Sequence, residues 1–474
     1  MQRLTKIGKI RPKNASEIGR SRIGIGFEKL DRDVFDPEKA YDKLAATGVK
    51  WARIQSGWAR TERERGVYDF AWLDAIVENL LSRGVQPWIC LCYGNGIYNK
   101  DAAEVFGAVG VPPLSSEEER AAWLAYVRAV VARYRGKVTH YEVWNEPDGK
   151  WCWRHGVSAR ELGVFTAATG RAIHETDPGA EVIGLVQCKP DLRYAADALD
   201  GTGMAENIDA LSFHHYDASE RAIPERVSSL RAVAERYKKG IKIIQGESGS
   251  QSRAGGNGAL RDKLWTERAQ MKQLVRHLVT DLACGVEFTS YFSCLDMIEA
   301  LNGRTGDRST YQDYGYFGVL RADFDENGFA VGTYSPKPSY YALQTLAAVF
   351  AEDPRVMNDA PVLFRPEAFP PLNTQDCART ELMTAFFERE NGSQCFVYWK
   401  PENILTTDYC GAVSFDVVSG GGEVFLADLC SGDVFALPEN MLERDGNFLR
   451  VRHAPVKDTP LALIAGDFCD WDRI

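Results

Sequence analysis

Short apolar runs alternate with longer segments of helical spacing from about residue 20 to residue 350. Runs of four to eight residues rich in Val, Ile and aromatic side chains predict β-strands, whereas apolar positions three and four apart predict helices. The eight predicted strands are 22–27, 50–55, 85–92, 138–145, 181–186, 208–214, 241–246 and 286–292. Helical segments lie between them, among them 37–47, 72–83, 116–135, 158–176, 224–239 and 263–283.

The ends of the predicted helices carry the expected capping residues. Asp36 and Ser116 stand where an N-cap is expected, and Gly48 and Gly84 follow helix ends. Eight strand-then-helix units predict an α/β protein with a (β/α)8 TIM barrel, whose functional site lies at the C-terminal ends of the strands. A doubly wound sheet is the alternative, but no Gly-x-Gly-x-x-Gly motif follows the first strand.

The pattern changes from Met357 onward, where short alternating runs are separated by Gly, Asn and Asp turns. This alternation predicts an accessory β-sandwich over residues 353–474, beside a catalytic barrel over residues 20–352. Residues 1–19 are a candidate for an additional strand of that sandwich. We expect the accessory domain to stabilise the barrel rather than to bind a ligand, because a buried interface needs no ligand.

Composition and charge narrow the classes of partner. The chain has 474 residues, 45% hydrophobic and 26% charged, and a net charge of −10, which is typical of a soluble globular protein and argues against nucleic acid or an anionic membrane. The sequence contains no signal-peptide-like start and no membrane-spanning run. Its 11 cysteines form no CxxC pairs, so we expect reduced thiols and a cytoplasmic location. The sequence implies no metal or organic cofactor. The oligomeric state, including a homo-oligomer, is not determined by the sequence.

Two glutamates end predicted strands of the barrel. The fourth strand runs into Asn145-Glu146-Pro147, and the seventh runs into Gly246-Glu247. Carboxylates at these two strand ends are expected to face each other across the barrel mouth. A pair about 5–5.5 Å apart hydrolyses a glycoside with retention through a covalent intermediate, whereas a lone glutamate is more often a cap or an ion-pair partner.

Other strand ends supply polar side chains to the same face. Arg53 ends the second strand, and His214 and Tyr216 end the sixth, with His215 between them pointing to the opposite face. We expect Arg53 to hold a carboxylate anionic, Tyr216 to bond Glu247, and His214 to lie near Glu146. Taken singly, each has a structural explanation, a buried ion pair for the arginine and a core hydrogen bond for the histidine.

The order Trp144-Asn145-Glu146-Pro147, His214-x-Tyr216, Gly246-Glu247 resembles clan A of the retaining glycoside hydrolases. Within it, the segments 26–28, 51–58, 66–70 and 315–320 are similar to glycoside hydrolase family 39, known for β-xylosidases and α-L-iduronidases. The resemblance implies that Glu146 is the acid/base, that Glu247 is the nucleophile, and that Asn145 bonds the sugar 2-hydroxyl. The family pattern at strand seven differs from Glu247-Ser248-Gly249 here, so the sugar stays open.

Loops after the strands supply further candidates for sugar binding. Tyr93 follows the third strand, Trp153 the fourth, and Glu28 the first. A loop of about 40 residues, 296–335, follows the eighth strand and holds Glu299, Tyr311, Tyr314 and Tyr316. Trp153 and Tyr316 are the preferred candidates for stacking on a sugar, and the bulk of the loop favours a closed pocket and exo action.

These observations predict a retaining exo-glycosidase that cleaves an equatorial bond in small oligosaccharides, β-xylosidase-like. The open specificities are β-glucosidase, β-galactosidase, arabinosidase and uronidase. One rival is a metal-dependent hydrolase with His214 and His215 as ligands, which the opposite directions of neighbouring strand residues disfavour. The other rival is a sugar-binding protein without turnover.

Overall fold

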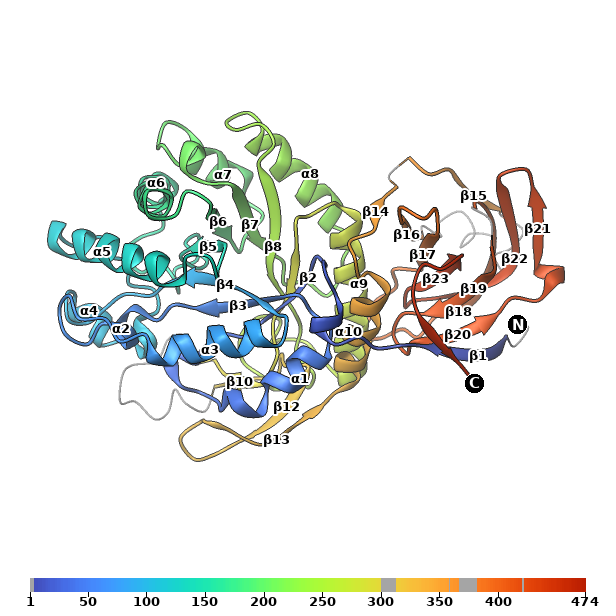
Figure 1. Cartoon of the computed structure of the whole chain (residues 1–474), viewed down its shortest axis with the longest axis horizontal. Coiled ribbons are helices and arrows are strands. Elements are labelled where there is room, and N and C mark those ends of the chain that lie inside the picture. The colour runs from blue at the N-terminus through green and yellow to red at the C-terminus, as the bar shows by residue number, and fades with distance from the viewer. Residues whose placement is uncertain (1–3, 300–312, 358, 366–381, 420–421) are drawn as a thin grey trace.

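The computed structural model describes residues 4–299, 313–357, 359–365, 382–419 and 422–474. Eight parallel strands close into a barrel in chain order, which confirms the predicted TIM barrel (Figure 1). The strands are β2 Ile23–Gly26, β3 Trp51–Gln55, β4 Gln86–Leu91, β5 His140–Val143, β6 Glu181–Gln187, β7 Ala210–His214, β8 Lys242–Ser248 and β9 Thr289–Tyr291.

Helices cover the outside of the barrel, because their apolar stripes pack on the outward-facing strand residues. They are α1 Tyr41–Ala46, α2 Trp58–Thr61, α3 Ala71–Ser82, α4 Lys100–Ala103, α5 Glu117–Tyr134, α6 Ala159–Thr176, α7 Leu192–Leu199, α8 Ile223–Ala234, α9 Glu267–Ala283 and α10 Pro338–Val349. The predicted caps are present: Ser116 accepts a hydrogen bond from the Glu119 amide, and Gly48 and Gly84 take positive φ angles of 79°.

A separate buried cluster lies among the barrel strands and includes Trp88, Ile183, Ala210, Ile244 and Phe288. Its members come from β4, β6, β7 and β8 and from the residue before β9. Side chains of this size fill the barrel interior, so the barrel is a packed core. A site is therefore expected at the C-terminal ends of its strands.

The segment after β9 is not the continuous loop of about 40 residues that the sequence predicts. It holds the strands β10 Met297–Ile298, β11 Tyr314–Gly315, β12 Leu320–Phe324 and β13 Ala330–Pro336, paired as two hairpins. Tyr311 lies outside the described residues. The correction has a simple cause: short strands in a region rich in Gly, Asn and Asp carry little hydrophobic periodicity.

Two antiparallel sheets form the accessory part. The larger sheet contains β14 Arg355–Val356, β16 Met383–Glu388, β17 Gln394–Trp399, β23 Leu461–Ala465, β19 Val424–Asp428, β20 Asp433–Ala436, β1 Thr5–Ile10 and β24 Trp471–Arg473, in that order. The smaller contains β15 Val362–Arg365, β18 Cys410–Val418, β22 Phe448–Lys457 and β21 Leu442–Asp445. Phe386, Phe396 and Phe415 from both sheets share one buried core, as in a β-sandwich.

The N-terminal segment contributes β1, which pairs with β20 and β24 and so lies beside the C-terminal end of the chain (Figure 1). Buried charges join the sandwich to α9: Lys272 Nζ lies 2.5 Å from Asp458, and Arg276 donates to the Glu402 carbonyl at 2.7 Å. These contacts agree with a stabilising role for the sandwich, while the domain boundary near residue 352 stays a prediction.

The ten cysteines within the described residues are all free thiols. Among the helices that the structure describes, none has both the length and the apolar character needed to cross a membrane.

Candidate active site

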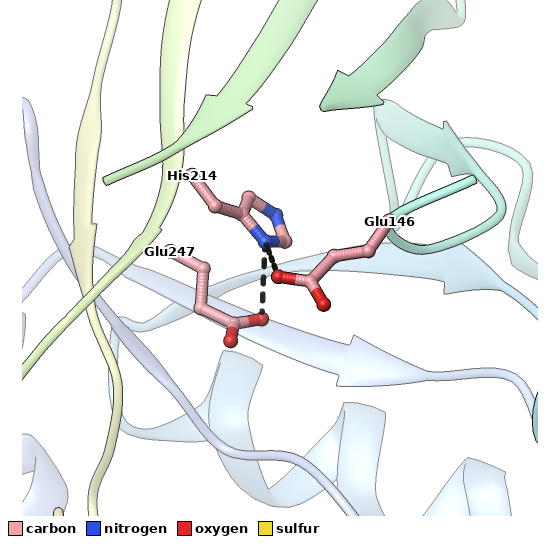
Figure 2. A group of neighbouring side chains, drawn as sticks. All are labelled: Glu146, His214 and Glu247. Carbon is pink, nitrogen blue, oxygen red and sulfur yellow. Dashed lines mark hydrogen bonds and ion pairs between the residues drawn. The ribbon is translucent and has the colours of Figure 1, made fainter. Parts of the chain in front are cut away.

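Glu146 and Glu247 lie at the C-terminal end of the barrel, on the segment after β5 and on β8, and their side chains point toward each other (Figure 2). One carboxylate oxygen of each lies within 4.8 Å of the other. A bulge helps to aim Glu247: on β7 Phe213 pairs with Gln245 and His214 pairs with Glu247, so Gly246 is the extra residue. A Cβ at position 246 would lie 2.3 Å from Ser212 Oγ, so a larger residue there would force Ser212 to move.

The backbone at Glu146 is also unusual. Trp144 and Glu146 have positive φ angles of 68° and 44°, in the left-handed region that non-glycine residues rarely adopt. Such conformations cost on the order of 1 kcal/mol or more and concentrate at functional sites. They turn the chain sharply at the end of β5.

Glu247 accepts hydrogen bonds on both oxygens. Arg53 Nη1 donates to its Oε2 at 2.9 Å, and the Tyr216 hydroxyl donates to its Oε1. Both contacts match the sequence-based expectations for these residues. Two donors on separate oxygens stabilise the ionised carboxylate.

Arg53 is fully buried and bonds four partners besides Glu247. Its Nη1 lies 3.0 Å from Glu28 Oε2, its Nε 2.7 Å from Glu142 Oε2, and its Nη2 2.8 Å from Asn145 Oδ1 and 3.6 Å from Cys90 Sγ. The guanidinium therefore orients Asn145 and Glu247 together, since a planar fork with five donors fixes the geometry of its acceptors.

Glu146 is bound by His214 and Trp151. His214 Nδ1 lies 2.9 Å from Glu146 Oε1 and 3.7 Å from Glu247 Oε2, so the imidazole stands between the two carboxylates (Figure 2). The indole of Trp151 donates to Glu146 Oε2 at 2.6 Å.

These surroundings separate the pKa values of the two carboxyl groups. Burial, together with the negative charges of Glu28 and Glu146, raises the pKa of Glu247 to about 7 despite attraction by His214 and Arg53. Burial opposes ionisation of Glu146 as well, but the hydrogen bonds and charge of His214 and the bond from Trp151 lower its pKa overall. Burial also lowers the pKa of His214, and the two glutamates more than reverse this, so it is raised.

For Glu247, the direction of the pKa shift and the hydrogen bonds favour different protonation states. The raised pKa favours the protonated carboxyl group, whereas the donors Arg53 and Tyr216 favour its anion. Because His214 Nδ1 reaches both carboxylates, the three groups titrate together and exchange protons over short distances. The proton thus belongs to the group of three rather than to one carboxyl.

The two glutamates lie in a cavity of about 490 Å³ at the barrel mouth. This volume lies within the usual range of small-molecule sites. The lining residues are Glu28, Lys29, Arg32, Gln55, Tyr93, Asn145, Glu146, Trp151, Cys152, Cys188, Lys189, Tyr216, Glu247, Gly258, Ala259, Leu260, Arg261, Asp262, Phe292, Glu299 and Phe317.

Most residues proposed from the sequence meet at this cavity. Glu28, Tyr93, Asn145 and Tyr216 line it with the two glutamates, and Arg53 and His214 contact those glutamates.

Trp153 and Tyr316 do not fit the sugar-stacking role expected of them. Trp153 is fully buried against Trp144 and Phe165, and Tyr316 packs under Arg253, so neither lines the cavity. Their neighbours Trp151 and Phe317 line it instead. The direction of a side chain in an irregular loop is set by tertiary packing, which the sequence pattern does not reveal.

Sequence reasoning missed Gln55, Lys29 and Arg32 as site residues. Gln55 Nε2 donates to Glu28 Oε2 at 3.3 Å and also to the Tyr93 hydroxyl at 3.3 Å. Gln55 ends β3, two residues after Arg53, so strand alternation was a signal that pointed to it. Lys29 and Arg32 lie beyond the end of β2, where periodicity carries no information.

Glu146, His214 and Glu247 are also the one group of three potential ligands in the described residues that comes close enough for a metal ion. Arg53 and Tyr216 already occupy both oxygens of Glu247, and a guanidinium 2.9 Å from that carboxylate repels a divalent cation. His215 points away and accepts from Arg226 at 3.2 Å, so the pair His214–His215 forms no ligand set. The arrangement suits proton transfer better than metal binding.

Comparison with known proteins finds several structures with the same architecture. A family 39 glycoside hydrolase from Bacteroides cellulosilyticus WH2 superposes with a TM-score of 0.63 at 16% identity, covering 94% of this chain and 81% of that one. A family 39 enzyme from Xanthomonas axonopodis pv. citri gives 0.60 at 15%, covering 95% of each chain. A monomeric β-xylosidase from Caulobacter crescentus CB15 gives 0.59 at 16%, covering 96% and 97%.

Comparison at the level of sequence matches only a short part of the chain. A family model described as glycoside hydrolase 42, β-galactosidase, matches residues 27–97. Comparison with curated proteins found no match.

The fold and the site together define the class: a TIM-barrel protein with an attached β-sandwich and a carboxylate pair at the barrel mouth. This chain has the fold of family 39 and other clan A glycoside hydrolases, as the sequence resemblance implied. At 15–16% identity the likeness is one of fold.

Proposed function

We propose that this protein is a retaining glycoside hydrolase that acts on small oligosaccharides or glycosides. The observation that carries the proposal is the pair Glu146 and Glu247, whose nearest oxygens lie within 4.8 Å of each other in one cavity. That spacing leaves no room for a water between the carboxylates and the anomeric carbon, so it supports the double-displacement route rather than inversion.

In the first step, a Glu247 oxygen attacks the anomeric carbon and the glycosidic bond breaks. Glu146 gives its proton to the departing oxygen, which leaves as an alcohol, and a glycosyl ester on Glu247 results. In the second step, Glu146 takes a proton from water as the water attacks the same carbon, and Glu247 departs as a carboxylate. In this mechanism Asn145, which accepts a 2.8 Å hydrogen bond from Arg53, bonds the sugar hydroxyl beside that carbon.

His214 supplies the proton arrangement that this route needs. The reacting form has a proton on Glu146 and none on Glu247. Transfer of the His214 Nδ1 proton to Glu146 Oε1 over 2.9 Å produces that form from the one with a charged imidazole. His214 is therefore a positioning residue that holds the shared proton.

Several features support β-xylosidase-like exo action on an equatorial bond. The structures with this fold include a protein described as a β-xylosidase, and the cavity volume of about 490 Å³ suits a short ligand. Other clan A specificities are the alternatives.

A screen of 4-nitrophenyl glycosides, covering xylose, glucose, galactose, arabinose and glucuronic acid, tests the activity. The sugar that is cleaved is then made as its 2-deoxy-2-fluoro derivative with a good leaving group, and peptides of the inactivated protein are mapped by mass spectrometry. We expect one label, on Glu247. A label on any other carboxylate rejects the assignment, and no turnover of any glycoside favours the binding protein without catalysis. Loss of activity with a chelator would restore the metal hypothesis.

A further inference from the structure

The charged side chains of the cavity divide into a buried set and an exposed set. Glu28, Lys29 and Glu299 are at least nine-tenths buried, whereas Lys189 and Arg261 are exposed at the rim. In a pocket that is closed at its base, the sugar to be cleaved occupies the buried end and the leaving group extends toward the rim. The two sets therefore act on different parts of a substrate.

Lys29 and Arg32, the two cavity cations whose side chains are buried, are already neutralised. Lys29 Nζ donates to the Ile298 carbonyl at 2.8 Å and lies 3.0 Å from Glu299 Oε1, while Arg32 Nε lies 3.2 Å from Asp31. Glu28 belongs to the lining, and its buried Oε1 has no hydrogen-bond partner, so this carboxylate adds negative charge at the base of the cavity. Such an end favours neutral hydroxyl groups and repels a uronate, because an added carboxylate would meet Glu28.

The cations of the rim are not neutralised. Within the described part of the chain, neither Lys189 nor Arg261 makes an ion pair or a side-chain hydrogen bond to a carboxylate; Lys189 Nζ lies 5.6 Å from the centre of the Trp151 ring. The one rim carboxylate in the lining is Asp262, and Asp148 is engaged by the backbone amides of Cys188 and Lys189 at 2.9 and 2.8 Å. The rim thus has a net positive charge on a chain whose net charge is −10.

The Lys189 part of the rim lies next to Glu146, the proposed acid/base. Trp151 donates to Glu146 Oε2, and Lys189 stands over the same indole ring. The group that protonates the leaving oxygen is therefore flanked by an aromatic face and a cation, which fits a leaving group that is apolar on one face and negatively charged at one edge.

We propose that the rim selects leaving groups that carry an anionic group, a carboxylate or a sulfate-type ester, through Lys189 and Arg261, and that the buried end takes a neutral sugar. This inference rests on the proposed glycosidase function. The natural substrate would then be a neutral glycosyl unit joined to an acidic sugar or to an aromatic acid.

The experiment compares glycosides of one neutral sugar with three phenols: 4-hydroxybenzamide, 4-hydroxybenzoate and 4-hydroxybenzenesulfonate. The variants are Lys189→Gln, Arg261→Gln and the double variant. Matched controls are Lys150→Gln and Lys263→Gln, exposed cations that lie next to Trp151 and two residues after Arg261 in the sequence but outside the lining. Because each variant is compared with wild type on the same glycoside, differences in phenol acidity cancel.

We expect each single variant to lower kcat/KM for the anionic glycosides by about threefold, and the double variant by roughly tenfold, as exposed charge pairs typically contribute. The loss for the benzamide glycoside should be at least threefold smaller, and 0.5 M NaCl should reduce the difference. The controls should match wild type. A loss confined to the benzoate or to the sulfonate identifies the anion.

Equal losses for the anionic and neutral glycosides, or losses in the controls, would overturn the inference while the hydrolase proposal stands. Faster cleavage of a glucuronide than of every neutral glycoside would also overturn it, since it contradicts the neutral buried end. If no aryl glycoside is cleaved at all, the proposed function fails, and this inference fails with it.

Discussion

The two faces of strands β7 and β8 carry polar side chains with opposite electrostatic behaviour. On the inner face, His214 and Glu247 contact Glu146 and Arg53. On the outer face, His215 accepts from Arg226 of α8, and Ser248 lies 3.3 Å from His277 of α9. Histidines 214 and 215 are consecutive in the chain, yet they belong to different clusters.

The pKa values follow the cluster. Burial lowers the pKa of both histidines, but on the inner face Glu247 and Glu146 reverse the effect and raise that of His214. On the outer face, burial and the positive charge of Arg226 lower the pKa of His215 to about 4. The inner cluster therefore holds a proton near neutrality and the outer cluster excludes one. A charge-holding side chain needs neighbours of opposite sign, and the pleat decides which neighbours it meets.

The largest expected effect is a difference in kcat between variants of two adjacent residues, Glu247 and Ser248. Glu247→Gln should lower kcat by on the order of 10⁴-fold or more, because the variant loses the carboxylate that we propose as the nucleophile. Ser248→Ala, on the outer face, should stay within about threefold of wild type. Steady-state kinetics on an aryl glycoside measure both, and a Ser248→Ala defect as large as that of Glu247→Gln would remove the distinction between the faces.

Glu146→Ala comes next. General acid–base catalysis contributes typically 10²–10⁴-fold, so cleavage of glycosides with poor leaving groups should fall by about that factor. With an activated leaving group, added azide should restore turnover and yield a glycosyl azide that keeps the starting configuration. If azide restores nothing, Glu146 is not the acid/base.

His214→Asn should shift the pH profile. In wild type, kcat/KM should fall below about pH 7, because Glu247 must be ionised and its pKa is about 7. Removing the attraction of His214 raises the pKa of Glu247 further, so the acidic limb should move to higher pH. Profiles between pH 5 and 9 measure the limb; the companion variant His215→Asn should leave it in place, and an identical shift in both variants would contradict the comparison.

The smallest effect concerns stability rather than turnover. Unfolded His215 takes up a proton near its ordinary pKa of 6.5, whereas the folded form does so only near 4, so wild type loses stability as the pH falls between these values. A shift of this size corresponds to on the order of 3 kcal/mol. His215→Asn keeps an acceptor for Arg226 and removes the titration. The free energy of unfolding of the variant, relative to that of wild type, should therefore rise as the pH falls over this range.

Urea unfolding at pH 7, 5.5 and 4 measures that difference. The control is His453→Asn, since His453 is exposed and its φ of 50° suits asparagine. A constant difference between His215→Asn and wild type at all three pH values would show that His215 does not exclude a proton.

Most of the site residues that the sequence predicted lie at the ends of strands. Arg53, Glu146, His214, Tyr216 and Glu247 follow from strand periodicity and from the order of the strands around a barrel. Lys29, Arg32 and Trp151 did not follow, because they lie in irregular segments whose course depends on contacts with distant parts of the chain. The hairpins between residues 296 and 336 were missed for the same reason.

The sequence by itself determined the barrel, the sandwich and the meeting of two carboxylates. Alternation and helix caps are local properties of the sequence that define the strands and helices. The order of the strands in a closed barrel then fixes which strand ends face each other. Only the tertiary structure decided which indole reaches the cavity, Trp151 rather than Trp153, and where a proton resides among Glu146, His214 and Glu247. Both depend on burial and on charges brought together from distant segments, and these exist only once the chain has packed.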